Sequence, residues 1–266
     1  MNLLNESLLN LHLGPASSFD NLAVVPLLAR TETAADYLTL EAALAKGTAR
    51  VTRGGAGEAN GLYCENAGQQ DVLCVATEPR LSMPGVRQRP SLLLGPGDRA
   101  RVSHLPSLVR PVEPRQLDVF DAREYRLGQF ARVFHALPRQ VGGVFVINDE
   151  PVGLEIFDAP ETFAAVLPQL VRSYALDALA LPQTGHRRPT IRCAEAFITQ
   201  VVVAAAAQRS AGRGQGSAAP ASSPTTSELR LESRRIMGGA LVARDRVVHL
   251  TAFQRHPEGN PFDSLH

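Results

Sequence analysis

The sequence contains no tryptophan and only four tyrosines among its 266 residues. Proteins that hold single-stranded nucleic acids depend on stacking between bases and aromatic side chains. The charges also balance, with 27 Lys and Arg residues against 26 Asp and Glu residues, whereas nucleic-acid-binding proteins usually carry a basic excess. The composition therefore predicts no nucleic-acid partner.

Cysteines and long apolar runs are scarce as well. The three cysteines, Cys64, Cys74 and Cys193, have no metal-ligand spacing, and a sparse, odd number is typical of a reducing compartment without a disulfide framework. The first residues lack the basic start and apolar core of a signal peptide. No apolar run reaches the roughly 18 residues that a membrane helix needs. We expect a cytoplasmic protein without a membrane span.

Two segments far apart in the chain share one pattern. Residues 142–157 align without gaps on residues 238–253, and seven of the sixteen positions are identical. Each copy begins with two glycines, continues as an apolar run and turns at Asp149 or Asp245. Apolar runs on both sides of a short polar turn are typical of a β-hairpin. The repeat thus predicts two equivalent hairpins.

Residues 1–112 alternate between short apolar runs and turn-forming residues. This pattern predicts a β-rich, sandwich-like half, with one short helix near residues 38–46 that Gly47 ends. Residues 113–140 are dense in charge, and their apolar residues recur at helical spacing. They predict a bridging helix that ends before Pro138.

Residues 141–257 combine the two hairpins with two helices. Asp158 and Glu161 resemble a capping box at the start of the first helix, which runs towards Leu181 and contains Pro168, where we expect a kink or a break. The second helix covers about residues 192–209. Residues 210–227 are mostly Ser, Ala, Gly and Pro and predict a disordered loop, and residues 258–266 a tail. We predict an α+β fold in which an antiparallel sheet carries both helices on one face.

Two polar residues lie on the predicted buried stripe of the first helix. Tyr174 and Asp177 are one helical turn apart. A carboxylate at such a position must be paired, or its pKa rises. Asp177 therefore either faces a pocket or pairs with a cation such as Arg192.

A histidine interrupts the second hairpin. His249 stands where the first copy has Gly153, and regular strand alternation puts it on the same face as Val247. It is either a hydrogen-bonded core residue or part of a cleft between the hairpins.

A short basic turn is the candidate anion site. Arg87, Gln88 and Arg89 follow a Met-Pro-Gly turn, and Glu78 precedes it. Two guanidinium groups on one turn can hold a phosphate, although a solvated charged turn would have the same sequence.

Sequence motifs for a metal site, a nucleophile or a dinucleotide site are weak or missing. The scattered histidines form no metal-ligand pattern, and no Gly-x-Ser-x-Gly or Cys–base pattern indicates a nucleophile. The paired glycines open strands rather than helices, so they are no dinucleotide fingerprint. We expect no metal and no cofactor.

Several segments together resemble a known pattern over most of the chain. They are residues 13–15, 21–27, 36–45, 65–66, 142–157, 170–179, 229–232 and 247–253, of which Tyr174–Leu179 and the C-terminal hairpin are the most specific. The chain resembles the prokaryotic family called the ARG and rhodanese-phosphatase-superfamily-associated protein domain. The family name implies an association with ADP-ribosylglycohydrolases and phosphatase-like partners around ADP-ribose, but it assigns no activity to the chain.

The family's polar motifs are reduced here. Its Gly-Glu motif corresponds to Thr77-Glu78, its Lys-Gln-Asn-Arg motif to Arg87-Gln88-Arg89, and its Cys-Val-Glu segment is replaced by residues 103–106. This erosion of the motifs favours binding over catalysis.

We consider three functions. The first is a binding or accessory module for an ADP-ribose-like or other phosphorylated nucleotide, with an ADP-ribose-processing protein as partner. The second is a hydrolase of a glycosidic or phosphoester bond, with Glu78 or Asp177 as general base and His249 assisting. The third is a scaffold that presents an apolar sheet face to a partner protein. The binding site of the first would contain Glu78, Arg87, Gln88, Arg89, Tyr174, Asp177 and His249.

Overall fold

The structure is a computed structural model that describes residues 3–31, 33–54, 61–75, 91–102, 117–182, 191–211 and 226–255. Of the helical residues 117–122 and 208–211, only the backbone is described. Within these ranges the fold is α+β, as predicted. The helices are α1 (Leu3–Leu9), α2 (Leu40–Ala45), α3 (Leu117–Val133), α4 (Pro160–Ala180) and α5 (Ile191–Ala211). The strands are β1 (Leu11–Leu13), β2 (Ser17–Phe19), β3 (Leu22–Ala29), β4 (Tyr37–Thr39), β5 (Ala49–Arg53), β6 (Leu62–Asn66), β7 (Asp71–Cys74), β8 (Leu92–Leu94), β9 (Arg99–Val102), β10 (Gln140–Ile147), β11 (Glu150–Phe157), β12 (Thr226–Glu232), β13 (Ile236–Ala243) and β14 (Arg246–Gln254).

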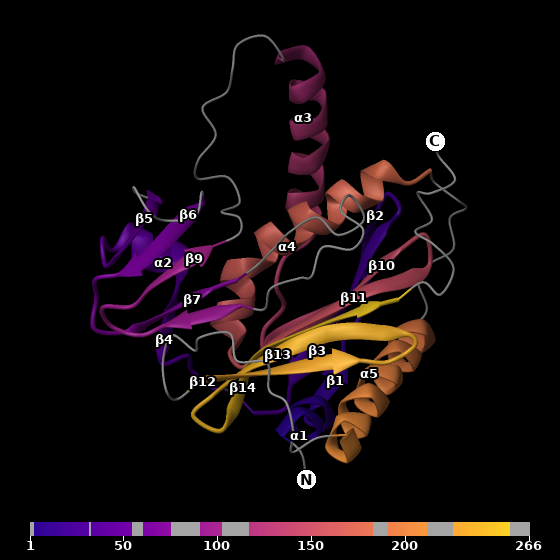
Figure 1. Cartoon of the computed structure of the whole chain (residues 1–266). Helices are drawn as coiled ribbons and strands as arrows, with labels where there is room; N and C mark the ends of the chain where they lie inside the picture. Colours follow the sequence, from indigo (N-terminus) through magenta and orange to yellow (C-terminus); the bar gives the residue numbers. More distant parts are fainter. Residues whose placement is uncertain are drawn as a thin grey trace.

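One large antiparallel sheet forms the centre of the molecule (Figure 1). Its strand order is β1-β3-β10-β11-β14-β13-β12, and β2 pairs with β3. The two predicted hairpins are confirmed as β10–β11 and β13–β14. Strands from both sides of residue 112 therefore share this sheet, whereas the division of the chain into domains at that residue stays a prediction.

Both hairpins contain a β-bulge at the same position of the repeat. In the first, Phe145 pairs with Gly153 and Val146 with Pro151, which leaves one extra residue between them. In the second, Leu241 pairs with His249 and Val242 with Val247. An extra residue shifts the alternation of side chains. The prediction that His249 and Val247 share a face is therefore wrong.

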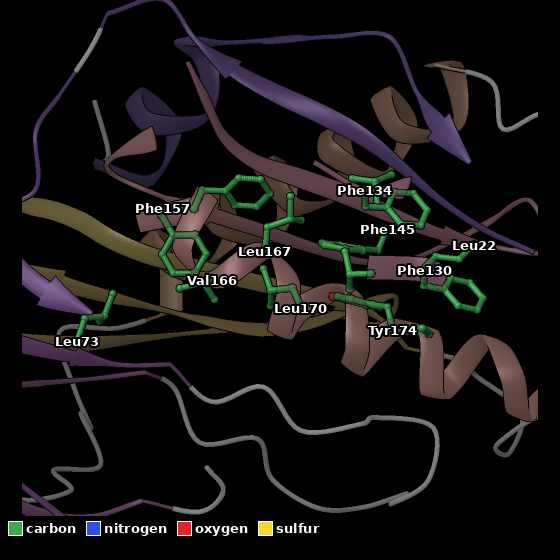
Figure 2. Close-up of a cluster of buried hydrophobic side chains, with 14 of the residues drawn as sticks. Leu22, Leu73, Phe130, Phe134, Phe145, Phe157, Val166, Leu167, Leu170 and Tyr174 are labelled. Carbon is green, nitrogen blue, oxygen red and sulfur yellow. The ribbon is translucent and has the colours of Figure 1, made fainter. Parts of the chain in front are cut away.

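The two faces of the large sheet are covered by different helices. On β10, Phe145 and Ile147 pack into a cluster with α3 and α4, and Val144 and Val146 pack into a cluster with α1 and α5. The prediction that the two C-terminal helices pack on one face is wrong, because α4 and α5 lie on opposite faces (Figure 1). Figure 2 shows the α4 side of this core.

Helix α4 begins differently from the prediction. Ala159 is its N-cap residue without a side-chain hydrogen bond, and Pro160 begins the helix. The predicted cap by Asp158 is wrong, because the Asp158 carboxylate accepts the hydroxyl of Tyr37 instead. A proline at the first position needs no partner for a backbone N–H. The helix also runs through Pro168 without a break, since buried residues on both sides of the proline anchor it to the core. A kink at Pro168 stays a prediction.

A small lobe is inserted between β3 and β10. Here "lobe" means the described residues 37–54, 61–75 and 91–102. It contains the sheets β4-β7-β8 and β5-β6-β9 and the predicted short helix, α2. Tyr37, Leu73 and Leu93 of the lobe pack into the same cluster as α4. The lobe is thereby attached to one face of the large sheet.

The predicted helices α3 and α5 are present, and other predictions fall beyond the description. Most of the expected loop and all of the expected tail lie outside the described residues, although residues 210–211 end α5 and residues 226–227 begin β12. Of the helices that the structure describes, none combines the length and apolar character needed to cross a bilayer.

Candidate functional site

A buried histidine connects two polar side chains on the α4 side of the large sheet. His249 on β14 has its Nδ1 atom 2.7 Å from the Oγ atom of Ser91 and its Nε2 atom 2.9 Å from the Oε2 atom of Glu155. Ser91 directly precedes β8 of the lobe, and Glu155 lies on β11. The histidine thus joins the lobe to the centre of the sheet.

Glu155 binds a second donor from the helix above it. The hydroxyl of Tyr174 on α4 donates to Glu155 Oε1 over 3.2 Å. All four side chains are buried, with exposed fractions of 1% for Ser91, 1% for Glu155, 2% for Tyr174 and 3% for His249. We call these four residues the Ser91–Tyr174 network. Polar groups at this depth need hydrogen-bond partners to avoid a large desolvation penalty, and the network supplies them.

Two aromatic stacks fix the rings of the network. The imidazole of His249 stacks on Phe157, with ring centroids 4.3 Å apart, and the ring of Tyr174 stacks on Phe145 at 3.9 Å. Figure 2 shows Phe145, Phe157 and Tyr174 within the apolar core. Because stacking restricts ring rotation, the imidazole nitrogens stay directed at Ser91 and Glu155.

In the neutral form of His249, the two hydrogen bonds assign the ring hydrogen to one of the imidazole nitrogens. A carboxylate only accepts hydrogen bonds, so with Glu155 as acceptor the Nε2 atom of His249 is the donor. In a neutral imidazole the other nitrogen is then an acceptor. Ser91 therefore donates its hydroxyl hydrogen to Nδ1. This is the arrangement of a hydroxyl that faces a base held by a carboxylate.

The structure brings together two of the predicted site residues. Tyr174 and His249 both contact Glu155. Asp177 lies one turn further along α4 and is buried, with 2% exposed. The predicted anion-binding residues Glu78, Arg87, Gln88 and Arg89 lie outside the described residues.

Sequence reasoning missed Glu155 and Ser91. The sequence did single out Glu155, because it is the one charged residue in the apolar run Gly153–Phe157, which is the buried part of its strand. Nothing in the sequence singled out Ser91, since it is 158 positions from His249 in the chain. Only the packing of the lobe on the sheet makes them neighbours.

A second polar cluster lies where the lobe meets the second hairpin. Arg244 contacts Asp36 and Asp71, and Arg246 contacts Asp36. The Nε atom of Arg246 is 3.2 Å from Asp158 Oδ2, an ion pair whose atoms are not aligned as a hydrogen bond. We call Asp36, Asp71, Asp158, Arg244 and Arg246 the lobe clamp.

Burial and charge act in opposite directions on the two central carboxyls of the lobe clamp. Burial raises the pKa of Asp158 above its usual value, against the hydrogen bond from Tyr37 and the charge of Arg246. Burial also opposes ionisation of Asp36, but Arg246 and Arg244 outweigh it and lower the pKa of that carboxyl. Burial and the neighbouring Asp158 raise the pKa of the Tyr37 hydroxyl. Tyr37 is therefore a hydrogen-bond donor rather than a phenolate.

Metal ligands do not gather in the described part of the chain. No three His, Cys, Asp or Glu side chains there form a group that could hold a metal ion. The chemistry that the described residues offer is therefore that of the Ser91–Tyr174 network and of the lobe clamp.

Comparison with known proteins identifies a family and no individual relative. No curated protein and no solved structure matches the chain. A family model matches residues 10–78 and 113–253, well over half of the chain. These matched residues include β3, both hairpins and α4, and therefore Glu155, Tyr174 and His249. The chain belongs to the family of the ARG and rhodanese-phosphatase-superfamily-associated protein domain.

Proposed function

We propose that the chain is a cytoplasmic accessory module that binds a phosphorylated nucleotide such as ADP-ribose. The Arg87-Gln88-Arg89 turn would contact the phosphates, and Glu78 would bind a hydroxyl of the ligand. Tyr174, Asp177 and His249 would support this site from the sheet side. An ADP-ribose-processing protein would be its partner.

The observation that carries the proposal is the hydrogen bond between Ser91 and His249. Ser91 follows Arg89 by two positions in the sequence, and its side chain is bound to a histidine that Glu155 holds in turn. An anion site needs donors that are held in place before the ligand arrives. The Ser91–Tyr174 network would supply this anchor at the C-terminal end of the basic turn.

The family description supports the choice of ligand. It names an association with ARG and with the rhodanese-phosphatase superfamily, and ARG stands for ADP-ribosylglycohydrolase. A ligand shared with such proteins would contain ribose and a diphosphate. Arginine suits a diphosphate because its planar guanidinium group can donate two hydrogen bonds to one phosphate.

The alternative functions receive less support. The scaffold hypothesis needs an exposed apolar sheet face, but α4 covers one face of the large sheet and α1 and α5 cover the other. In the hydrolase hypothesis His249 assists Glu78 or Asp177. Both nitrogens of His249 are bound to other residues, Ser91 and Glu155.

Isothermal titration calorimetry with ADP-ribose and with NAD tests the proposal. We expect binding of ADP-ribose to the intact chain and a loss of at least about tenfold in affinity in Arg87→Ala/Arg89→Ala, because a hydrogen bond to a charged group contributes about 1.5–3 kcal/mol. The matched control is Arg234→Ala/Arg235→Ala, which removes two exposed arginines from the turn before β13. No heat with either ligand, or equal losses in the two double variants, would contradict the proposal.

A further inference from the structure

We propose that Ser91 is a nucleophile, with His249 as its general base, and that the pair reacts with small, uncharged carboxylic esters. This activity goes beyond ligand binding and does not depend on it. The proposal rests on the placement of three functional groups from three separate elements. These groups are the Ser91 hydroxyl, the His249 imidazole and the Glu155 carboxylate, joined at 2.7 and 2.9 Å.

The first argument is the direction of the hydrogen bonds. In neutral His249, with Glu155 as acceptor of the Nε2 hydrogen, the lone pair of Nδ1 faces the Ser91 hydroxyl. A serine hydroxyl becomes nucleophilic when a base can accept its proton as the oxygen attacks. The relation between nucleophile, base and orienting carboxylate is recognised by geometry and not by the order of the residues in the chain.

The second argument is that two further groups fix the base. Phe157 stacks on the imidazole, and the Tyr174 hydroxyl holds the second oxygen of Glu155. Glu155 and Tyr174 are positioning residues, because they act through His249.

The third argument concerns the substrate class. Ser91 lies outside the strands, directly before β8. Its burial and the aromatic ring beside His249 disfavour a charged or bulky group. A short acyl group without charge requires the least displacement of neighbouring side chains and the least desolvation.

The reaction balances with water as the second substrate. Ser91 Oγ forms a bond with the ester carbonyl carbon while its proton moves to Nδ1 of His249. The carbon–oxygen bond to the alcohol then breaks, and the leaving oxygen takes the proton from Nδ1. Water attacks the acyl-serine with the same base, which releases the acid and restores the hydroxyl.

A small alkyl fluorophosphonate probe tests the nucleophile directly. It forms an oxygen–phosphorus bond with an activated serine and releases fluoride. We expect peptide mapping by mass spectrometry to locate the label on Ser91 of the native chain and on no residue of Ser91→Ala. Ser18→Ala, which removes an exposed serine of β2, should label at the rate of the unmodified chain. We also expect hydrolysis of p-nitrophenyl acetate to fall to background in Ser91→Ala.

The base and its positioning residue are tested by substitutions that separate charge from size. His249→Gln should slow labelling by about 100-fold or more, because a general base contributes about 10²–10⁴. Glu155→Asp keeps the carboxylate and should retain more labelling than Glu155→Gln, which keeps the size and loses the charge. A purely structural role predicts the reverse order. Circular dichroism confirms the fold of each variant, and the Glu155 pair decides if His249→Gln does not fold.

Three results would overturn the proposal. One is no label on Ser91 in the native chain under conditions that label a known serine hydrolase. Another is labelling at equal rates in the native chain and in folded His249→Gln. The last is labelling that occurs only at urea concentrations where the chain unfolds. The calorimetric test of nucleotide binding uses different residues, so the two proposals can fail separately.

Discussion

The two hairpins of the large sheet have the same backbone but different side chains at its centre. Both turns place two consecutive residues at positive φ, Asn148 and Asp149 in the first and Arg244 and Asp245 in the second, as a type I′ turn requires. Both carry the same bulge. Their outer neighbours, β3 and β12, also pair antiparallel to the first strand of each hairpin, although only β3–β10 has a register shift, between Gln140 and Gly142. The sheet therefore has an approximate two-fold symmetry, and its axis passes between β11 and β14.

The Ser91–Tyr174 network arises where the copies differ. His249 replaces the glycine at position 153 of the first copy, and Glu155 replaces the threonine at position 251 of the second. Glu155 pairs with Thr251 at the symmetry axis, and Phe157 pairs with His249 two residues away. One polar substitution in each copy thus meets the other. The repeat therefore determines the backbone of both hairpins, and the positions at which the two copies differ in sequence form the polar site.

The turns differ in the same manner. In the second hairpin Arg244 and Arg246 hold the carboxylates of the lobe clamp. In the first, Asn148 donates to the Pro182 carbonyl and Glu150 is exposed. The second turn therefore binds the lobe through its arginines, and this side is also the one from which Ser91 reaches His249.

The largest expected effect comes from making the first copy like the second at the symmetry axis. Glu155→Thr removes the acceptor of His249 and of Tyr174 and leaves two buried donors without it. Removing one partner of a buried, charged pair lowers the free energy of unfolding by about 3–5 kcal/mol. We expect the free energy of unfolding in urea to fall by about 3 kcal/mol. Glu150→Ala, an exposed residue of the same strand, should change it by less than about 0.5 kcal/mol.

An unchanged unfolding free energy in Glu155→Thr would mean that the network is not formed. In that case Tyr174→Phe would also be neutral. If the network is formed, Tyr174→Phe should lower the free energy of unfolding by about 1 kcal/mol, because it removes one hydrogen bond.

The next effect tests why each copy opens with a glycine. A Cβ atom on Gly142 would lie 2.3 Å from the Glu155 carbonyl oxygen, and one on Gly238 would lie 2.2 Å from that of Thr251. Both contacts are with backbone and cannot relax by a change of rotamer. We expect Gly142→Ala and Gly238→Ala each to lower the free energy of unfolding by about 2–3 kcal/mol.

The second glycine of each pair provides the matched control. A Cβ on Gly143 meets the side chain of Val24 at 2.9 Å, and one on Gly239 meets the Leu229 carbonyl at 3.1 Å. These contacts are easier to relieve, so the alanine variants should lose less stability than those at Gly142 and Gly238. Equal losses at all four positions would show that the distance of closest approach does not determine the effect.

The hairpins were predictable because their signals are local. Alternation and turn chemistry lie within sixteen consecutive residues, and the same holds for α2 with Gly47 after it. The bulge at Val248 was not predictable, since a single extra residue leaves the pattern of apolar residues almost unchanged. For that reason the face of His249 relative to Val247 was predicted wrongly.

The tertiary relations carried no local signal. The apolar stripes of α4 and α5 indicate that each helix is buried, but not against which face of a sheet that is apolar on both. Tyr174 and His249 could be singled out as polar residues in apolar surroundings. Their common partner Glu155 could have been found by the same reasoning, whereas Ser91 depends on the position of the lobe.

A smaller effect is expected when the second turn is made like the first. Arg246→Ala removes the cation beside Asp158, whose side chain is 7% exposed. We expect a loss of about 1–2 kcal/mol in the free energy of unfolding, because a mostly buried carboxylate loses its ion pair. Arg244→Ala removes one of the two arginines that contact the more exposed Asp36, together with the contact to Asp71, and should cost less than about 1 kcal/mol. The reverse order would contradict the assigned roles of the two arginines.

The smallest effect is a pH dependence of opposite sign at the two central carboxyls of the lobe clamp. Burial raises the pKa of Asp158, so the folded chain binds this proton more tightly than the unfolded chain. Its contribution to stability is therefore complete below the usual pKa of an aspartate, 3.8, and is lost as the pH rises through the raised pKa. Asp36 has a lowered pKa, because its arginines outweigh burial. Its contribution is present above 3.8 and is lost as the pH falls through the lowered pKa.

The measurement is urea unfolding of the unmodified chain, Asp158→Asn and Asp36→Asn at a series of pH values across this range. The stability advantage of the unmodified chain over Asp158→Asn should shrink with rising pH, and its advantage over Asp36→Asn should grow. Slopes of the same sign would mean that the arginines do not distinguish the two carboxyls.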